Sequence, residues 1–192
     1  MSSEIQGARC GGRRGFVESG FKTAFAVAVV GGVGVGGEAK AEEGERWMNK
    51  GGKREGISNE DIREVVRRDV VEGQFLTNGK LSRAIYDEGA VFQDEIDTYT
   101  LDKWITGTSR LFNGRNSRVE LVGEVEANED YVEFRFDEVL EFNIPIFHPS
   151  TPLTGRVRLE RDKETGLIVR YREYWDEDVG EVLKKAKFRF SL

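Results

Sequence analysis

Three stretches of this chain alternate largely between apolar and polar residues, and they constrain its fold more than any other feature. Residues 118–126, 131–142 and 167–176 repeat with a period of two, the period of β-strands that bury one face. Glu138 and Glu173 occupy positions on the buried faces. A carboxyl group inside a protein is costly unless it is hydrogen-bonded or lies in a hydrated cavity. The alternation therefore predicts a sheet that encloses a pocket.

Helical spacing of apolar residues precedes these strands. Ser58 has the character of an N-cap, with acidic residues directly after it. A later helix carries Trp104 on its apolar stripe, and Gly114 is predicted to end it. The order of helices before strands predicts an α+β fold. The predicted helices cover residues 59–72, 79–86 and 101–112, and a short strand covers residues 90–94.

The last alternating segments predict a hairpin. The turn Glu164-Thr165-Gly166 suits a three-residue loop with glycine in the left-handed region. This turn sets Leu159 opposite Tyr171, Val157 opposite Glu173, Gly155 opposite Trp175, and Arg158 opposite Arg172. The arginine pair is unfavourable by itself, and acids on the outer face of the neighbouring strand, Glu133, Asp137 or Glu141, could offset it. Pro145, Pro149 and Pro152 predict a loop before this hairpin.

Composition limits the classes of function. The chain has 192 residues, of which 38% are apolar, enough for one ordinary core. Its net charge of -6 argues against nucleic acid as a partner, because phosphate binding depends on Lys and Arg patches. Cys10 and His148 are the only residues of their kinds, so the chain cannot build a disulfide framework or a Cys/His zinc site. A carboxylate-only metal site remains open, but we expect neither a metal nor a cofactor.

The N-terminal region has the order of an export signal. Arg13-Arg14 precede a small-residue apolar run over residues 24–37, and Ala39-Lys40-Ala41 fits a cleavage site. This pattern resembles a twin-arginine signal, with the twin-arginine translocase as a transient partner. The run is too short and glycine-rich to predict a stable membrane span. We expect a cleaved signal over residues 1–41, a flexible linker over 42–57 and one domain over 58–192.

Two motifs resemble a known superfamily. Residues 86–94 (YDEGAVFQD) resemble the helix exit and first strand of the nuclear transport factor 2-like fold, which SnoaL-like cyclases and ketosteroid isomerase share. Residues 172–176 (REYWD) resemble the final strand of an uncharacterised SnoaL-like family of plants, algae and cyanobacteria. The resemblance implies a cone-shaped, curved antiparallel sheet packed against three N-terminal helices. That family commonly has His and Asp where this chain has Tyr171 and Glu173, so the imidazole suited to proton transfer is absent.

The candidate site residues are acids and aromatics on the predicted concave face. Two neighbouring carboxyl groups raise each other's pKa and can supply a general acid, and aromatic side chains form walls for a flat apolar ligand. The alternatives are a turn cap for the first acid, hydrated glutamates at the mouth of the cone and aromatics in a solid core. The catalytic candidates are Asp94, Glu138 and Glu173, and the ligand-binding candidates are Tyr99, Trp104, Phe136, Tyr171 and Trp175.

Three functional hypotheses follow. The first is an exported SnoaL-like domain that binds a small, largely apolar molecule, in the thylakoid lumen of the chloroplast or in a bacterial periplasm. The second is an acid/base enzyme of isomerase, dehydratase or cyclase type that uses the pocket carboxylates. The third is a structural or assembly subunit, with a homodimer formed through the outer sheet face. The resemblance lends no single reaction, because the fold hosts enzymes, binders and adaptors.

Overall fold

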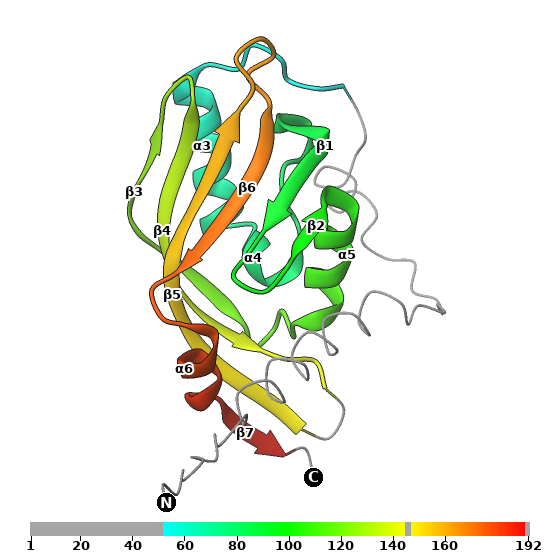
Figure 1. The fold of residues 1–192 in the computed structure, drawn as a ribbon, viewed down its shortest axis with the longest axis vertical. Coiled ribbons are helices and arrows are strands. Elements are labelled where there is room, and N and C mark those ends of the chain that lie inside the picture. The colour runs from blue at the N-terminus through cyan, green and yellow to red at the C-terminus, as the bar shows by residue number, and fades with distance from the viewer. Residues whose placement is uncertain (1–51, 145–146, 191–192) are drawn as a thin grey trace, which may run out of the picture.

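The computed structural model describes residues 52–144 and 147–190, and the predicted export signal lies outside them. Its elements (Figure 1) are α3 (Asn59–Val71), α4 (Phe75–Asn78), the 3₁₀ turn η1 (Arg83–Ile85), β1 (Tyr86–Gln93), β2 (Thr98–Thr100), α5 (Leu101–Leu111), β3 (Arg118–Ala127), β4 (Tyr131–Glu141), β5 (Phe147–Arg161), β6 (Ile168–Trp175), α6 (Val179–Lys184) and β7 (Lys187–Phe190). Among the described residues, no helix is long and apolar enough to cross a membrane.

The strands form one curved sheet in the order β2-β1-β6-β5-β4-β3, and β7 pairs with β5. All pairs are antiparallel except β1 with β6, which is parallel. The sheet wraps around α3 and α4, while α5 lies beside β1 and β2 (Figure 1). The long strand β5 continues beyond this body to α6 and β7. This is the α+β architecture that the sequence predicts, with one parallel pair added.

Two of the three predicted helices are confirmed. Ser58 caps α3, and its side chain accepts a hydrogen bond from the Asp61 amide at 3.0 Å. Helix α5 also forms as predicted, but it ends because Phe112 is extended, and Gly114 plays no part in its termination. The predicted helix over residues 79–86 is wrong. Helix α4 comes earlier and ends at Gly79, whose positive φ of 75° and closeness to the Ile105 carbonyl suit only glycine.

The predicted proline loop is also wrong. Pro149 and Pro152 lie within strand β5, while Pro145 lies outside the described residues. Proline cannot donate to a ladder, but its carbonyl still accepts a hydrogen bond. The Phe142 amide donates to the Pro149 carbonyl at 2.8 Å. The strand can therefore pass through these prolines without losing its register with β4.

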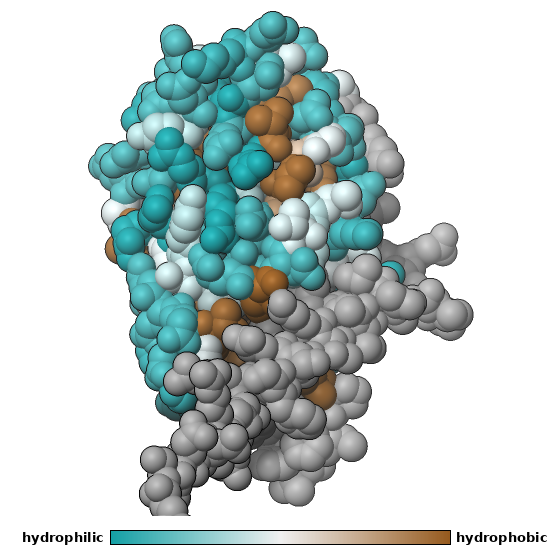
Figure 2. All heavy atoms as spheres, viewed as in Figure 1, coloured by the Kyte–Doolittle hydropathy of each residue, from teal (hydrophilic) through white to brown (hydrophobic). Residues whose placement is uncertain are grey.

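The predicted hairpin between β5 and β6 is confirmed residue by residue. Gly166 adopts a φ of 73°, as the left-handed position of the turn requires. On the outer face, two carboxylates offset the predicted arginine pair. Glu133 Oε2 accepts from Arg158 at 3.3 Å, and also from Arg156 at 2.9 Å, while Glu95 Oε1 accepts from Arg172 at 2.8 Å. Figure 2 shows that this outer face of the sheet is predominantly hydrophilic.

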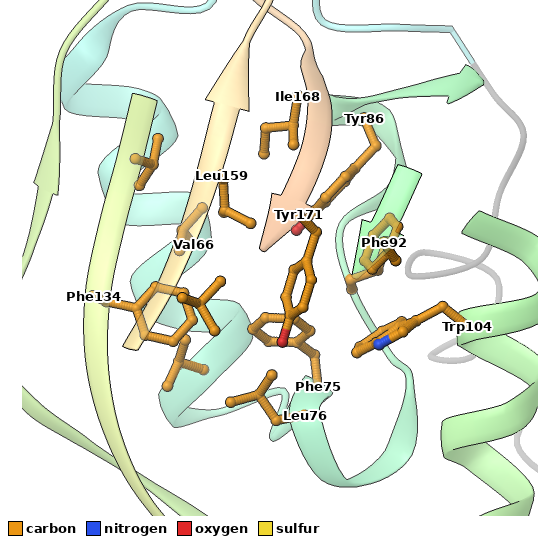
Figure 3. Packing of buried hydrophobic residues seen from close by; sticks show 14 of the residues in the cluster. Val66, Phe75, Leu76, Tyr86, Phe92, Trp104, Phe134, Leu159, Ile168 and Tyr171 are labelled. Carbon is orange, nitrogen blue, oxygen red and sulfur yellow. The ribbon is translucent and has the colours of Figure 1, made fainter. Parts of the chain in front are cut away.

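The aromatic part of the core fills the space between the sheet, α4 and α5. Tyr171 stacks on Phe92 with ring centroids 4.8 Å apart, and Trp104 lies 4.9 Å from Phe92. Figure 3 shows Tyr171 reaching from β6 toward Phe75, with Phe92 and Trp104 on one side and Phe134 on the other. Such pairs add about 0.5–1.5 kcal/mol each beyond the area that they bury. This part of the concave face is therefore solidly packed.

Gly155 is the position where the sheet tolerates no side chain. A Cβ atom there would overlap the Tyr174 carbonyl oxygen and lie 2.9 Å from the Phe136 ring. We expect Gly155→Ala to lower the free energy of unfolding by about 1–3 kcal/mol, because overpacking forces neighbouring atoms to shift. Urea unfolding measures the change. Gly114→Ala is the control, since its added Cβ has its closest neighbour at 3.8 Å, and equal effects of the two substitutions would contradict this packing.

Candidate functional site: a pocket with three carboxyl groups

A pocket opens where the aromatic core ends, between the lower part of the sheet, α5 and α6. It has about 580 Å³ of empty space, counting the solvent at its open side. Asp94, Glu138 and Glu173 line it, and no Lys, Arg or His is among its lining residues in the described part of the chain. Most of the remaining lining residues are apolar. We call this space the carboxyl pocket.

Glu138 is the most unusual of the three acids. It lies on the inward face of β4, its exposed fraction is 3%, and its Oε2 atom has no hydrogen-bond partner in the described structure. Burial raises its pKa well above the usual value, and the charges of Glu173 and Asp137 raise it further. These effects favour the protonated form. In the protonated form, a hydrogen on Oε2 would have no acceptor within the described structure.

Glu173 is held by two neighbours on its own strand. Trp175 Nε1 donates to its Oε1 at 2.6 Å, and the Tyr171 hydroxyl donates to its Oε2. Burial raises the pKa of Glu173 to about 7, and the charge of Asp94 acts in the same direction. The two hydrogen bonds and the charge of Arg172 lower the pKa and only partly compensate. Glu173 therefore changes its charge near neutral pH.

Asp94 has both of the roles that the sequence left open. Its Oδ1 accepts from the amides of Ile96 at 2.7 Å and Asp97 at 2.8 Å, so it caps the turn between β1 and β2. It also lines the carboxyl pocket. Burial raises its pKa and the charge of Asp97 adds to this, while the two backbone hydrogen bonds and Arg172 lower it.

The structure divides the five aromatic candidates into two groups. Trp104 and Trp175 line the carboxyl pocket, but Tyr99, Phe136 and Tyr171 are not among its lining residues. Tyr171 contacts the pocket only indirectly, by holding Glu173. Phe136 packs against Gly155, and Tyr99 is buried on β2 opposite Phe92. His148, predicted in a loop, lies on strand β5 and outside the pocket lining.

Sequence reasoning missed the floor of the pocket, which comes from the end of α5 and from α6. Thr108 and Leu111 belong to the buried stripe of α5, so helical periodicity alone could have suggested them. Val182 of α6 also lines the pocket, and its carbonyl accepts a hydrogen bond from Thr151 Oγ1 at 2.8 Å. No sequence signal places α6 there, because its position depends on contact with Thr151 of β5, which is distant in the chain.

Glu141 also differs from its predicted position. The alternation places it on the outer face, but its exposed fraction is 5%. Its Oε1 accepts from Asn113 Nδ2 at 2.9 Å and from Asn116 Nδ2 at 2.7 Å. It fixes the loop after α5 to the end of β4. Unlike Glu138, this buried acid therefore has a structural role that its contacts explain.

The pocket combines Glu138, whose protonated form is favoured by burial, with Glu173, whose pKa is raised to about 7. Such a pair can donate a proton or hydrogen bond from one group and accept one at the other. No group of three or more side chains in the described residues is placed to hold a metal ion. The three acids therefore share a pocket without forming a metal-binding cluster.

Comparisons with known proteins bear on the fold. No protein-family model matches the chain, and no curated protein is significantly similar to it. A solved structure described as a SnoaL-like polyketide cyclase, from Jannaschia sp. CCS1, superimposes with a TM-score of 0.51 and 16% identity over 70% of this chain and 96% of that chain. The fold is SnoaL-like. This SnoaL-like fold, of the nuclear transport factor 2-like type, confirms the predicted fold class.

Two further solved structures are similar at lower TM-scores. One is the BvnE pinacolase from Penicillium brevicompactum, with a TM-score of 0.48 and 12% identity over 66% of this chain and 91% of that chain. The other is a ketosteroid isomerase-like protein from Catenulispora acidiphila in complex with trimethylamine, with a TM-score of 0.46 and 16% identity over 64% and 91%. Both structures are similar to this chain in shape.

Proposed function

We propose that the chain binds a small, largely apolar molecule in the carboxyl pocket, with the polar end of that molecule against Glu138. The observation that carries the proposal is the unpartnered Oε2 of Glu138. A buried polar group without a partner costs about 1–3 kcal/mol, so a residue of this kind usually has a functional reason. The apolar lining and the two tryptophans support a ligand with a hydrocarbon body.

A titration with 3,3-dimethylbutan-1-ol tests this function. Trp104 and Trp175 line the pocket, so binding should change the intrinsic fluorescence of the full-length protein in a saturable way. Glu138→Met should abolish the saturable change. The control is Glu133→Gln, on the same strand but on the outer face, which should bind as wild type does. A wild-type titration without saturation, or one that Glu138→Met leaves unchanged, would contradict the proposal.

The second candidate function is acid/base catalysis of isomerase, dehydratase or cyclase type. The pKa of Glu173, about 7, supports it, because a general base works best near the ambient pH. In this scheme Glu138 donates a proton to a substrate oxygen, Glu173 removes one from carbon, and Asp94 adds negative charge. Exchange of the α-protons of cyclohexanone with deuterated water, followed by NMR, separates the candidates, since a binder without catalysis leaves the exchange rate at its buffer value.

We further propose that the protein is exported by the twin-arginine route, to the thylakoid lumen or a bacterial periplasm, and belongs to the SnoaL-like family of plants, algae and cyanobacteria. The support is the sequence of residues 1–41 and the REYWD motif. A precursor that stays uncut in the stroma or cytoplasm would contradict export. A homodimer through the outer sheet face is proposed as well, and light scattering of the mature protein tests it.

A further inference from the structure

We propose that the ligand of the carboxyl pocket is a small organic cation, an alkylammonium compound whose charged end lies among Asp94, Glu138 and Glu173. This inference rests on the proposed binding function and names the chemical class of the ligand. Two independent features of the pocket carry it. The first is the sign of every ionisable group in the lining, and the second is the aromatic composition of the walls.

The ionisable lining of the pocket is of one sign. It contains three carboxyl groups and no Lys, Arg or His in the described part of the chain. One of these groups, Glu138, is 3% exposed, and its Oε2 has no hydrogen-bond partner in the described structure. An anionic ligand would meet no positively charged side chain among these lining residues, and a neutral ligand would supply no countercharge. A cation supplies it, because it stabilises the ionised form of each neighbouring carboxyl group.

The walls favour the same class of ligand. Trp104, Trp175, Phe112 and Phe142 line the pocket, and the last two rings are 5.3 Å apart. The face of an aromatic ring is electronegative, and rings beside carboxylates are the usual recognition site for quaternary and tertiary ammonium groups. The hydrocarbon part of such a cation also matches the apolar lining. An inorganic cation would gain little here, because the described acids form no metal-binding cluster.

Arg172, whose charge acts on both Asp94 and Glu173, is already engaged on the other side of the sheet. Arg172 pairs with Glu95 at 2.8 Å, donates to the Glu173 carbonyl at 2.6 Å, and has its guanidinium 4.5 Å from the Tyr174 ring centroid. Its charge lowers the pKa values of Asp94 and Glu173 only partly. Asp97 and Asp137 face the same groups with negative charge. Positive charge on a ligand would therefore still stabilise the ionised form of these carboxyl groups.

Choline and 3,3-dimethylbutan-1-ol test the inference, because they have nearly the same shape and differ in a positively charged nitrogen against a neutral carbon. We expect calorimetric titration of the full-length protein at about pH 8, above the pKa of Glu173, to give an affinity for choline at least about tenfold higher than for the alcohol. Choline should also release protons from the pocket, so its binding heat should depend on the ionisation enthalpy of the buffer. The alcohol should show no such dependence.

Three variants locate the effect. Glu173→Gln should remove most of the preference for choline, and Glu138→Gln should reduce it, while both keep affinity for the alcohol. Glu133→Gln removes the same charge from the outer face of β4 and should leave the preference intact. Thermal unfolding of each variant shows that it is folded.

The outcomes separate the two proposals. Equal affinities for choline and the alcohol would overturn the cationic ligand and leave the binding function standing, because the alcohol would still bind. Loss of the preference in Glu133→Gln would also overturn it, since the effect would then come from net charge. Failure of both probes to bind at millimolar concentration would overturn the inference together with the binding function. Two results support the inference. One is a preference for choline that only Glu173→Gln abolishes, and the other is a preference that Glu138→Gln weakens.

Discussion

The Glu138→Met variant is expected to be more stable than the wild type by about 2–4 kcal/mol at neutral pH. Glu138 is 3% exposed and its Oε2 lacks a partner, so the native state loses the hydration of this carboxyl without compensation. Methionine is of similar length, carries no charge and fills irregular apolar space. Urea unfolding of both proteins measures the difference, and the same variant should lose ligand binding. Stability and binding would then change in opposite directions, as at many functional sites.

Glu141→Met is the matched comparison on the same strand. Glu141 is also buried, but Asn113 and Asn116 donate to it, so its removal leaves two amide groups without an acceptor. We expect this variant to be less stable than the wild type by about 1–3 kcal/mol. If Glu138→Met were destabilised as Glu141→Met is, Glu138 would have a structural role and the functional reading of the pocket would fail.

Stability should fall as the pH rises from about 4.5 to about 7. Burial raises the folded-state pKa of Glu173 to about 7, and it raises the pKa of Asp69, which accepts hydrogen bonds from Ser82, to about 7 as well. Between the unfolded and folded pKa values the native state binds more protons than the unfolded state. The stabilisation is therefore complete below the unfolded values and lost as the pH rises through the folded ones, by about 3–4 kcal/mol for each group.

Glu88 has the opposite effect on stability, in a lower range of pH. The pKa of Glu88 is lowered to about 2, first by its hydrogen bonds with Arg83 and Lys53. Its contribution is present above its unfolded pKa and is lost as the pH falls toward the folded value. That contribution is small, because the carboxylate is half exposed. The stability maximum is therefore expected near pH 4–5, below the usual range for proteins.

Urea unfolding across the pH range measures this profile. Glu173→Gln and Asp69→Asn should each flatten the decline between pH 4.5 and 7, because each removes one group that gains a proton on folding. Glu133→Gln, on the outer face, should leave the profile unchanged. A free energy of unfolding that is flat or rises over this range would contradict the buried, proton-binding state of both carboxyl groups.

The parts of the fold that the sequence predicts are those set by local period and turn chemistry. The alternation fixed which face of β4 is buried, and the turn at Gly166 fixed the register that places Val157 opposite Glu173. Helices α3 and α5 follow from their apolar stripes, and α3 follows also from its N-cap, Ser58. The helix over residues 79–86 failed because Gly79 serves as a C-cap, and its left-handed backbone depends on contact with α5.

The residues of the candidate site, like the elements of the fold, are predictable from the sequence only in part. Glu138 and Glu173 were identified because an acid at an inward strand position is visible in the sequence, whereas Asp94, which follows β1, was proposed from the resemblance. The assignment of aromatics was not possible in the same way, because Trp104 of α5 and Tyr171 of β6 both lie on the buried face of their element and contact each other. Tyr171 stacks in the core with Phe92, whereas Trp104 also reaches the pocket. The difference depends on how α5 and α6 pack at the end of the sheet, and periodicity carries no information about it.

Native mass spectrometry of the mature protein purified from its natural source, beside the same protein with Glu138→Met, tests the central claim most directly. The account predicts that the wild-type protein retains one small molecule that dissociates on collisional activation, and that the variant does not. Detection of the wild-type protein only at the mass of its polypeptide would contradict this claim, and so would a small molecule retained equally by both proteins.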